Sequence, residues 1–314
     1  MITNEESTGF NNTNQSGLRA DREFLKYIEI PLEKKFSSKI KGKFLLIKYK
    51  YDKNREEEFT EFILDNLMNY ALSKKERESL KSDPIKKARK LWLIAIRRYV
   101  KKSKKFKGGE IGELILFHLL EVVEQAVQIV NKMFLKTSGN MHFHGADAVH
   151  FGVDGDLRIL FLGESKTGQK FSQVLTDAIK KVNEYCNEEK QTFEVDLAVG
   201  HISEDIPEEL RQEIKNYLDP SKDDLSNFTE THAIFLGFEY KILKELENEH
   251  SGKELISKVI ETYRSEIEGY IHRIEEKISE YPNLQNRRFL FYLLPFKDLN
   301  SIRNKVLEEI KNVK

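Results

Sequence analysis

The order of apolar and polar positions along the chain predicts alternating helices and strands. Residues 43–51 are rich in aromatic and apolar side chains, which favours a strand. Helical spacing of apolar residues follows over residues 56–105, and Asp83-Pro84 is predicted to begin a second helix within that stretch. A long apolar helix is expected over residues 110–133. The first part of the chain therefore combines one strand with several helices.

A hairpin is the clearest local prediction after that helix. Residues 146–151 and 157–163 have strand patterns, and Asp154-Gly155-Asp156 between them is typical of a tight hairpin turn. The same patterns predict further helices at residues 172–186, 207–217, 253–279 and 298–313, and further strands at residues 192–199, 233–238 and 288–294.

These elements predict an α/β fold in which a mixed central sheet is flanked by helices. The basic run at residues 101–107, followed by Gly108-Gly109, marks the clearest internal seam. We expect four regions: a disordered polar tail at residues 1–20, a mostly helical N-terminal region at 21–107, a core at 108–240, and a C-terminal helix-strand-helix accessory region at 241–314.

Composition narrows the class of protein. Lys+Arg and Asp+Glu are both 52, so any binding of nucleic acid must depend on local basic patches rather than on net charge. The single cysteine, Cys186, excludes an internal disulfide and suits a reducing cytoplasm. The longest apolar runs are too short to span a bilayer, and neither a signal peptide nor a phosphate-binding loop is visible. We therefore expect a soluble cytoplasmic protein, without membrane association, that is not itself an ATPase.

The pattern with the most chemical content lies at residues 145–166. Gly145-Ala146-Asp147 is followed, 17 positions after the aspartate, by Glu164-Ser165-Lys166. Side chains alternate faces along a strand, so Glu164 and Lys166 point the same way. Two carboxylates beside an ammonium suit hydrolysis of a phosphodiester with Mg²⁺ or Mn²⁺. Asp147 and Glu164 are the predicted metal ligands, and Lys166 is predicted to orient or deprotonate the attacking water and to stabilise developing charge.

A further acid is expected from the preceding helix. Glu113 follows Gly112 and leads an apolar run, whereas Glu110 lies one turn earlier and also follows a glycine. Helical periodicity does not separate the two, because the helix is apolar nearly all round. Glu113 is the preferred catalytic acid of the pair, and Glu110 remains the alternative.

Each of these motifs also has a purely structural interpretation. Glu164 and Lys166 can form an incidental ion pair, although charges at the end of a buried strand need a partner or a metal. Three histidines, His142, His144 and His150, surround Asp147, but without a cysteine they make a poor zinc site.

Basic and polar side chains provide candidate DNA contacts. Lys170 and Gln173, at the start of the helix after the motif, either contact phosphates or form a solvated face. The basic run contributes Lys101, Lys102, Lys104 and Lys105, which are predicted to contact the DNA backbone or to face a partner subunit.

Taken together, the motifs resemble the PD-(D/E)XK nuclease superfamily, with Ala146 in place of the proline of that name. More narrowly, Gly112-Glu113, residues 145–150 (GADAVH) and residues 162–166 (LGESK) are similar to the small nuclease subunit of the Hachiman anti-phage defence system. The resemblance implies a restriction-endonuclease-like core and a metal-dependent DNase whose catalytic positions are Glu113, Asp147, Glu164 and Lys166. It also implies that His150 lines the site or contacts phosphate.

The same resemblance implies a superfamily-2 helicase subunit as partner, which restrains the nuclease until phage damage or unusual DNA is sensed. Two other interpretations stay open. One is a stand-alone restriction or repair nuclease of the same fold, and the other is a non-catalytic DNA-binding regulatory subunit.

Overall fold

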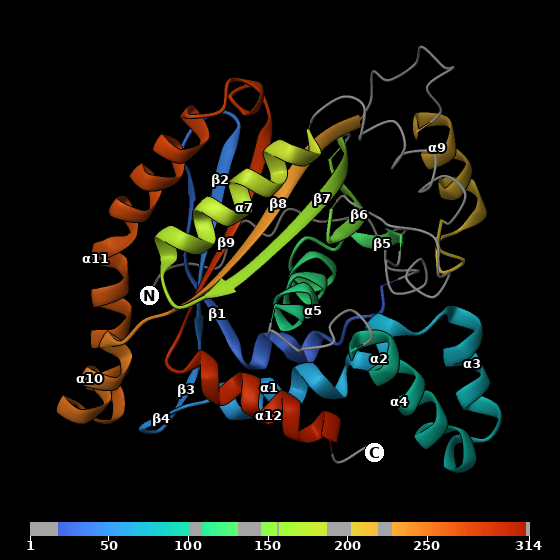
Figure 1. The fold of residues 1–314 in the computed structure, drawn as a ribbon, viewed down its shortest axis with the longest axis horizontal. Helices are drawn as coiled ribbons and strands as arrows, with labels where there is room; N and C mark the ends of the chain where they lie inside the picture. Colours follow the sequence, from blue (N-terminus) through green and yellow to red (C-terminus); the bar gives the residue numbers. More distant parts are fainter. Residues whose placement is uncertain are drawn as a thin grey trace.

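A seven-stranded sheet organises the protein in the computed structural model (Figure 1). The structure describes residues 18–100, 109–130, 146–155, 157–186, 202–218 and 228–311. In spatial order, the strands are β1 (Ile28–Lys35), β2 (Ile40–Ile47), β9 (Arg288–Phe296), β8 (Phe228–Glu239), β7 (Leu157–Gly168), β6 (Ala148–Asp154) and β5 (Val127–Val130).

The sheet is mixed. Strands β2, β9, β8 and β7 run parallel, whereas β1, β6 and β5 are each antiparallel to the neighbour toward the centre. Strand β9, inside the sheet, is apolar and buried at every position after Arg288, as expected for a parallel strand covered on both faces. Strand β1 contains Pro31, whose missing N–H is tolerated at the sheet edge, and the β1–β2 register shifts between Glu29 and Leu32.

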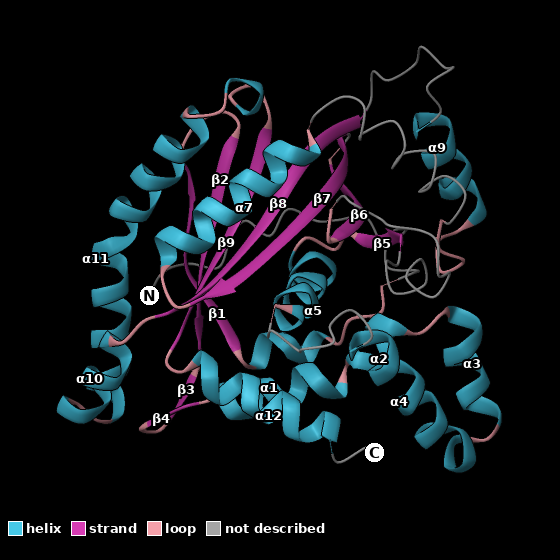
Figure 2. Ribbon diagram, in the orientation of Figure 1, coloured by secondary structure: helices cyan, strands magenta, loops and turns pink. Residues whose placement is uncertain are grey.

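Helices cover both faces of the sheet (Figure 2). On one face, a core cluster joins the sheet to α1 (Glu56–Asp65), α2 (Leu67–Ala71), α4 (Pro84–Val100), α5 (Glu110–His118) and α12 (Leu299–Lys311). On the other face, a second cluster joins it to α7 (Phe171–Tyr185), α10 (Ile242–Glu249) and α11 (Gly252–Ser279). The remaining described elements are α3 (Lys74–Ser82), α9 (Glu208–Leu218), the short strands β3 (Tyr49–Lys50) and β4 (Lys53–Asn54), and single turns of helix at Arg22–Lys26 and Pro282–Leu284.

Helix α5 is the most enclosed of the described helices, because every one of its nine residues is buried. Its sequence is apolar nearly all round, which is the pattern of a helix surrounded by protein. Directly after it, Leu119–Val123 continues as a π-helical turn, and the chain then enters β5. A single helix over 110–133 is therefore wrong: the helical part ends at Val123, and residues 127–130 pair with β6.

The α/β fold predicted from the sequence is confirmed, including the hairpin, in which Gly155 adopts a left-handed φ of +61°. Strand β1 and helix α10 were not anticipated. The expected strand at 192–199 lies outside the described residues, as does the expected tail up to residue 17. The predicted domain boundaries at residues 107 and 240 stay predictions. The sheet contains strands from each of the regions 21–107, 108–240 and 241–314. Within the described ranges, no helix has the length and apolar character needed to cross a membrane.

The buried His118 at the end of α5 gives a prediction about acid stability. Its side chain is fully buried, stacks on Phe24 with ring centroids 5.4 Å apart, and donates from Nδ1 to the Leu114 carbonyl oxygen at 2.8 Å. Burial lowers the pKa of His118 to about 4. Because the unfolded chain binds the proton near pH 6.5 and the folded chain does not, stability falls between pH 6.5 and 4, by up to about 3 kcal/mol from this group.

A His118→Phe variant keeps the aromatic packing and removes the titration. Chemical denaturation at several pH values is expected to show a shallower loss of unfolding free energy below pH 6.5 than in the unmodified protein. Parallel pH profiles for the two proteins would contradict this assignment.

Candidate active site

The candidate site lies where β7 extends past the start of β6. The β6–β7 pairing ends at Ala148 and Gly163, and beyond that point the described residues pair β7 with β8 alone. Asp147 occupies this open edge. Its backbone N–H donates to the Gly163 carbonyl, and its carboxylate accepts from the Ser165 N–H at 3.1 Å and the Ser165 hydroxyl at 3.4 Å. The edge of β7 that β6 leaves unpaired thus holds the Asp147 side chain in place.

Glu164 and Lys166 lie on one face of β7 and form an ion pair. The Lys166 ammonium also donates to the Ser165 carbonyl at 3.3 Å. The Glu164 side chain is 5% exposed and that of Lys166 is 30% exposed, so the pair lies at the boundary between the protein interior and solvent. Burial acts to lower the pKa of Lys166, but the charges of Glu164 and Asp147 outweigh it and raise that pKa above its usual value. Lys166 is therefore a cation at neutral pH.

The first turn of α5 brings Glu113 to the same place. Glu113 is buried, and its carboxylate accepts a 3.3 Å hydrogen bond from the hydroxyl of Tyr70 in α2. Burial, followed by the charges of Glu113 and Asp147, raises the pKa of Tyr70 well above its usual value, so the hydroxyl remains a donor. The charge of Glu113 also contributes to raising the pKa of Lys166. The four predicted catalytic residues are thus brought into one neighbourhood.

Glu110 is directed elsewhere. It is as buried as Glu113, but its charge acts on Tyr99 of α4 rather than on Tyr70. Burial is the largest cause of the raised pKa of Tyr99, and the charge of Glu110 is the second. Its Oε2 atom has no hydrogen-bond partner within the described part of the chain. Helical periodicity left Glu113 and Glu110 open as the helix acid, and the geometry favours Glu113.

The predicted role of His150 is not supported. The ring is fully buried, lies 6.0 Å from the ring of Phe117 in α5, and has a pKa lowered well below its usual value by burial and then by Arg19. By alternation from Ala148, which packs in the α5 core, His150 faces that helix rather than solvent. A neutral, enclosed imidazole does not reach a DNA phosphate in this structure.

The other predicted DNA contacts are placed only in part. Lys170 precedes α7 and Gln173 lies in its first turn, and both side chains are exposed. Lys101, Lys102, Lys104 and Lys105 lie outside the described residues, as do His142 and His144. DNA contact by Lys170, Gln173 and the four lysines stays a prediction.

Two partners of the site were missed in the sequence. Alternation along the strand turns the Ser165 side chain away from Glu164 and Lys166, yet its N–H and hydroxyl bind Asp147. Tyr70 lies 43 residues before Glu113, and no local pattern connects the two. Gly163 carried a usable signal, because a glycine inside an apolar strand often marks a close approach of another segment.

The donor set suits a hard divalent cation better than zinc. Mg²⁺ in proteins is commonly held by one or two carboxylates and retained waters, and Asp147 and Glu164 offer that chemistry at an open strand edge. No cluster of three or more His, Cys, Asp and Glu side chains able to hold a metal ion occurs in the described ranges. A site of this kind would depend on water for most of its ligands.

Comparison with known proteins identifies the family. The sequence profile of the HamA family matches residues 22–310, which is most of the chain. The chain belongs to the HamA family. HamA is a subunit of the Hachiman defence system, so the protein is a component of such a system. The resemblance noted from the motifs is confirmed at the level of the family. No curated protein matches the chain.

The HamA match runs from the helical turn at Arg22–Lys26 to α12. It therefore includes every strand of the seven-stranded sheet, and the strands outside residues 108–240 are as much part of the family domain as β6 and β7.

A substitution at Gly163 tests the packing that positions the site. A Cβ atom at Gly163 would lie 2.8 Å from the Ala148 Cβ and 2.9 Å from the Leu116 Cδ2, so Gly163→Ala forces β6 or α5 to move. We expect a loss of about 1–3 kcal/mol in unfolding free energy. Thermal or chemical denaturation measures the change.

Gly269→Ala is the matched control, because Gly269 lies in α11 with nothing within 4 Å of the added methyl group. It is expected to be neutral or stabilising by about 0.5–1 kcal/mol, since alanine favours helix over glycine. Equal destabilisation by both substitutions would show that the contact at Gly163 is not tight.

Proposed function

We propose that this HamA protein is a metal-dependent deoxyribonuclease, the effector of its Hachiman defence system. One observation carries the proposal: Asp147, Glu164 and Lys166 meet at the open edge of β7, with Glu113 behind them. Two acids and a lysine on a strand edge are the residue types that metal-assisted phosphodiester hydrolysis uses. Membership of a defence family supports DNA as the substrate class.

Each residue has a task that follows from its surroundings. When held by Asp147 and Glu164, Mg²⁺ or Mn²⁺ would acidify water and neutralise phosphate charge. Asp147 is fixed for this role by the Ser165 N–H, and Glu164 by its strand. Lys166, paired with Glu164 on β7, would orient or deprotonate the attacking water and stabilise charge on the phosphorus oxygens.

Glu113 supports the site from behind. Its hydrogen bond from Tyr70 fixes one carboxylate oxygen, and its place in the first turn of α5 brings that carboxylate to the edge of β7. It is suited to hold a water molecule that the two strand acids cannot reach.

DNA binding and control complete the proposal. Exposed Lys170 and Gln173 are proposed to contact phosphates, together with Lys101, Lys102, Lys104 and Lys105, and cleavage is proposed to have low sequence specificity. A net charge of zero favours weak DNA binding by the isolated chain, since few counterions would be released. We propose that a superfamily-2 helicase subunit (HamB-like) delivers DNA and restrains the nuclease.

The first test is cleavage of supercoiled plasmid with Mg²⁺, with and without EDTA. Asp147→Asn, Glu164→Gln and Lys166→Met are each expected to lower the nicking rate by about 100-fold or more, because each removes charge from the reacting centre. Glu113→Gln is expected to lower the rate more than Glu110→Gln, since only Glu113 is linked to Tyr70 and Lys166.

Matched controls are Glu57→Gln in α1 and Lys53→Met in β4, which make the same chemical changes at exposed positions outside β7. They are expected to cleave at the unmodified rate. If the site variants and the controls nick the plasmid at the same rate, the catalytic roles assigned to Asp147, Glu164 and Lys166 are wrong. Cleavage that continues at the same rate in EDTA would contradict the proposed dependence on a metal ion.

The second test concerns restraint. The chain is purified alone and as a complex with the helicase subunit of its own system, and both are incubated with plasmid and Mg²⁺. The complex is expected to cleave more slowly until ATP and damaged or single-stranded DNA are added. A complex that cuts intact plasmid as fast as the free chain would contradict the restraint.

A further inference from the structure

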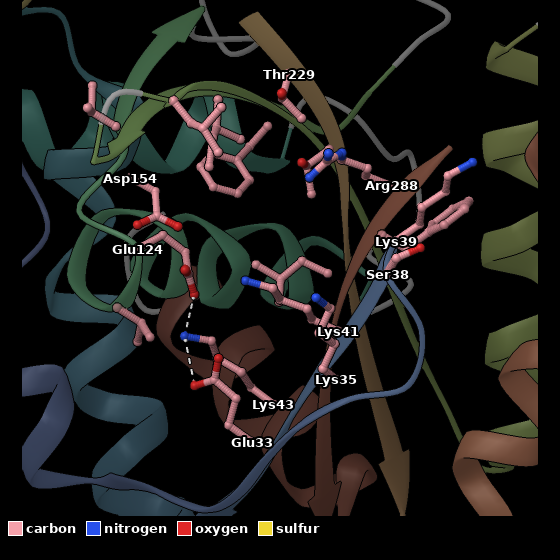
Figure 3. A pocket seen from close by; sticks show the side chains of 18 residues that line it. Glu33, Lys35, Ser38, Lys39, Lys41, Lys43, Glu124, Asp154, Thr229 and Arg288 are labelled. Carbon is pink, nitrogen blue, oxygen red and sulfur yellow. Dashed lines mark ion pairs between the residues drawn. The ribbon is translucent and has the colours of Figure 1, made fainter. Parts of the chain in front are cut away.

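A second site lies on the opposite side of the sheet from Glu164 and Lys166. A cavity of about 390 Å³ opens at the amino ends of the parallel strands, between the β1–β2 turn, the start of β9, and the β6–β7 hairpin (Figure 3). Phe161 lines this cavity and packs in the α5 core. Since Glu164 is three residues further along β7, alternation places it on the other face. The cavity is therefore separate from the candidate active site.

One of the lysines in the cavity is already neutralised by its neighbours. Lys43 is buried, with its ammonium 3.0 Å from a Glu124 oxygen and 3.4 Å from a Glu33 oxygen. Glu124 also accepts a 2.7 Å hydrogen bond from the hydroxyl of Tyr292. These groups form a closed network that leaves little attraction for a ligand.

The other cations of the cavity are uncompensated. Lys39 donates to the neutral amide oxygen of Asn286 at 2.9 Å. Lys35, Lys41 and Arg288 are exposed and form no ion pair with any described residue. Four cations thus meet at one cavity; with Lys43 and the carboxylates of Glu33, Glu124 and Asp154, the lining carries five positive and three negative charges. Such a concentration of unpaired positive charge favours a ligand with more than one negative charge.

The charges are also segregated. Arg288, Lys39 and Lys41 lie on the β2 and β9 side of the cavity, and Glu124 and Asp154 lie across from them (Figure 3). An anionic group is therefore drawn to the β2–β9 side. The hydroxyls of Ser38 and Thr229 add neutral donors there.

The wall between the two charged sides is apolar. It is formed by residues of β6, β7 and β9 and by the end of the π-helical turn, and Leu157 at its rim is 50% exposed. The other apolar lining residues are Val123, Val153, Ile159, Phe161, Phe289 and Leu290. An apolar surface beside a cluster of cations suits a planar base joined to a phosphate, and the volume exceeds what an inorganic ion needs.

We propose that this cavity binds a phosphate-bearing nucleotide, with its phosphates on Lys39, Lys41 and Arg288 and its base against the apolar wall. The nucleotide is either a free nucleoside polyphosphate or the phosphorylated end of a DNA strand, since both present the same chemistry. Asp154, across the cavity, accepts hydrogen bonds from base amino groups. This proposal does not rest on nuclease activity, because the cavity shares no residue with the cluster on β7.

The test measures binding by the full chain in EDTA, where no metal-dependent cleavage occurs. Its result can therefore be interpreted even if the nuclease proposal fails. One arm titrates ATP by calorimetry, and the other titrates a fluorescent 5′-phosphorylated oligonucleotide at low salt. The double variant Lys41→Gln/Arg288→Gln is expected to weaken binding of whichever probe binds, ATP or the oligonucleotide, by at least about tenfold, because two charge-assisted contacts are lost. Thr229→Phe is expected to weaken binding without a change of charge, because it reduces the cavity volume.

Lys53→Gln/Lys75→Gln is the matched control, since it removes the same charge from exposed positions outside the cavity. Binding of ATP that competes with the oligonucleotide identifies the free nucleotide as ligand, whereas binding of the oligonucleotide alone identifies the strand end. Three results would overturn the proposal: equal weakening by the cavity and control variants, equal competition by an oligoglutamate peptide, or no binding of either probe at millimolar concentration. Circular dichroism of each variant confirms that it is folded.

Discussion

The close approach of helix α5 to strand β7 is the constraint on which the candidate site depends. A Cβ atom at Gly112 would lie 3.1–3.4 Å from Ser165 and Thr167, and one at Gly163 would lie under 3 Å from Leu116. Small residues at these two points let the helix lie directly on the strand. That proximity brings Glu113, at the start of α5, to the level of Asp147 and Lys166, and it leaves Ser165 buried between them. A wider spacing would separate the helix acid from the strand acids.

The strand part of the site could be predicted because it depends on local geometry. Alternation along β7 is sufficient to place Glu164 and Lys166 together, and a hairpin returns the chain to Asp147. The HamA resemblance named the same three residues. His150 shows the limit of motif reasoning: it lies three residues after Asp147, and the same alternation turns it inward toward α5.

The rest of the fold depends on contacts that no local pattern contains. Tyr70 reaches Glu113 across 43 residues, and a hydrophobic periodicity cannot specify which helix supplies such a donor. The helix expected over 110–133 failed for a related reason. The apolar run continues past Val123, but tertiary pairing with β6 takes residues 127–130 into the sheet. Strand β1, with its proline and charged residues, carried too weak a pattern to be recognised.

The position of β9 has a consequence for how the protein is made. This strand comes late in the chain, yet it lies between β2 and β8 in the middle of the sheet. During synthesis, β2 and β7–β8 cannot join into one sheet until residues 288–296 have left the ribosome. Strand β8 and the hairpin that holds Asp147 and Glu164 therefore wait, with an unpaired neighbouring edge, for almost the whole chain. A protein built this way gains its finished architecture only at the end of translation, so a truncated product carries an incomplete sheet.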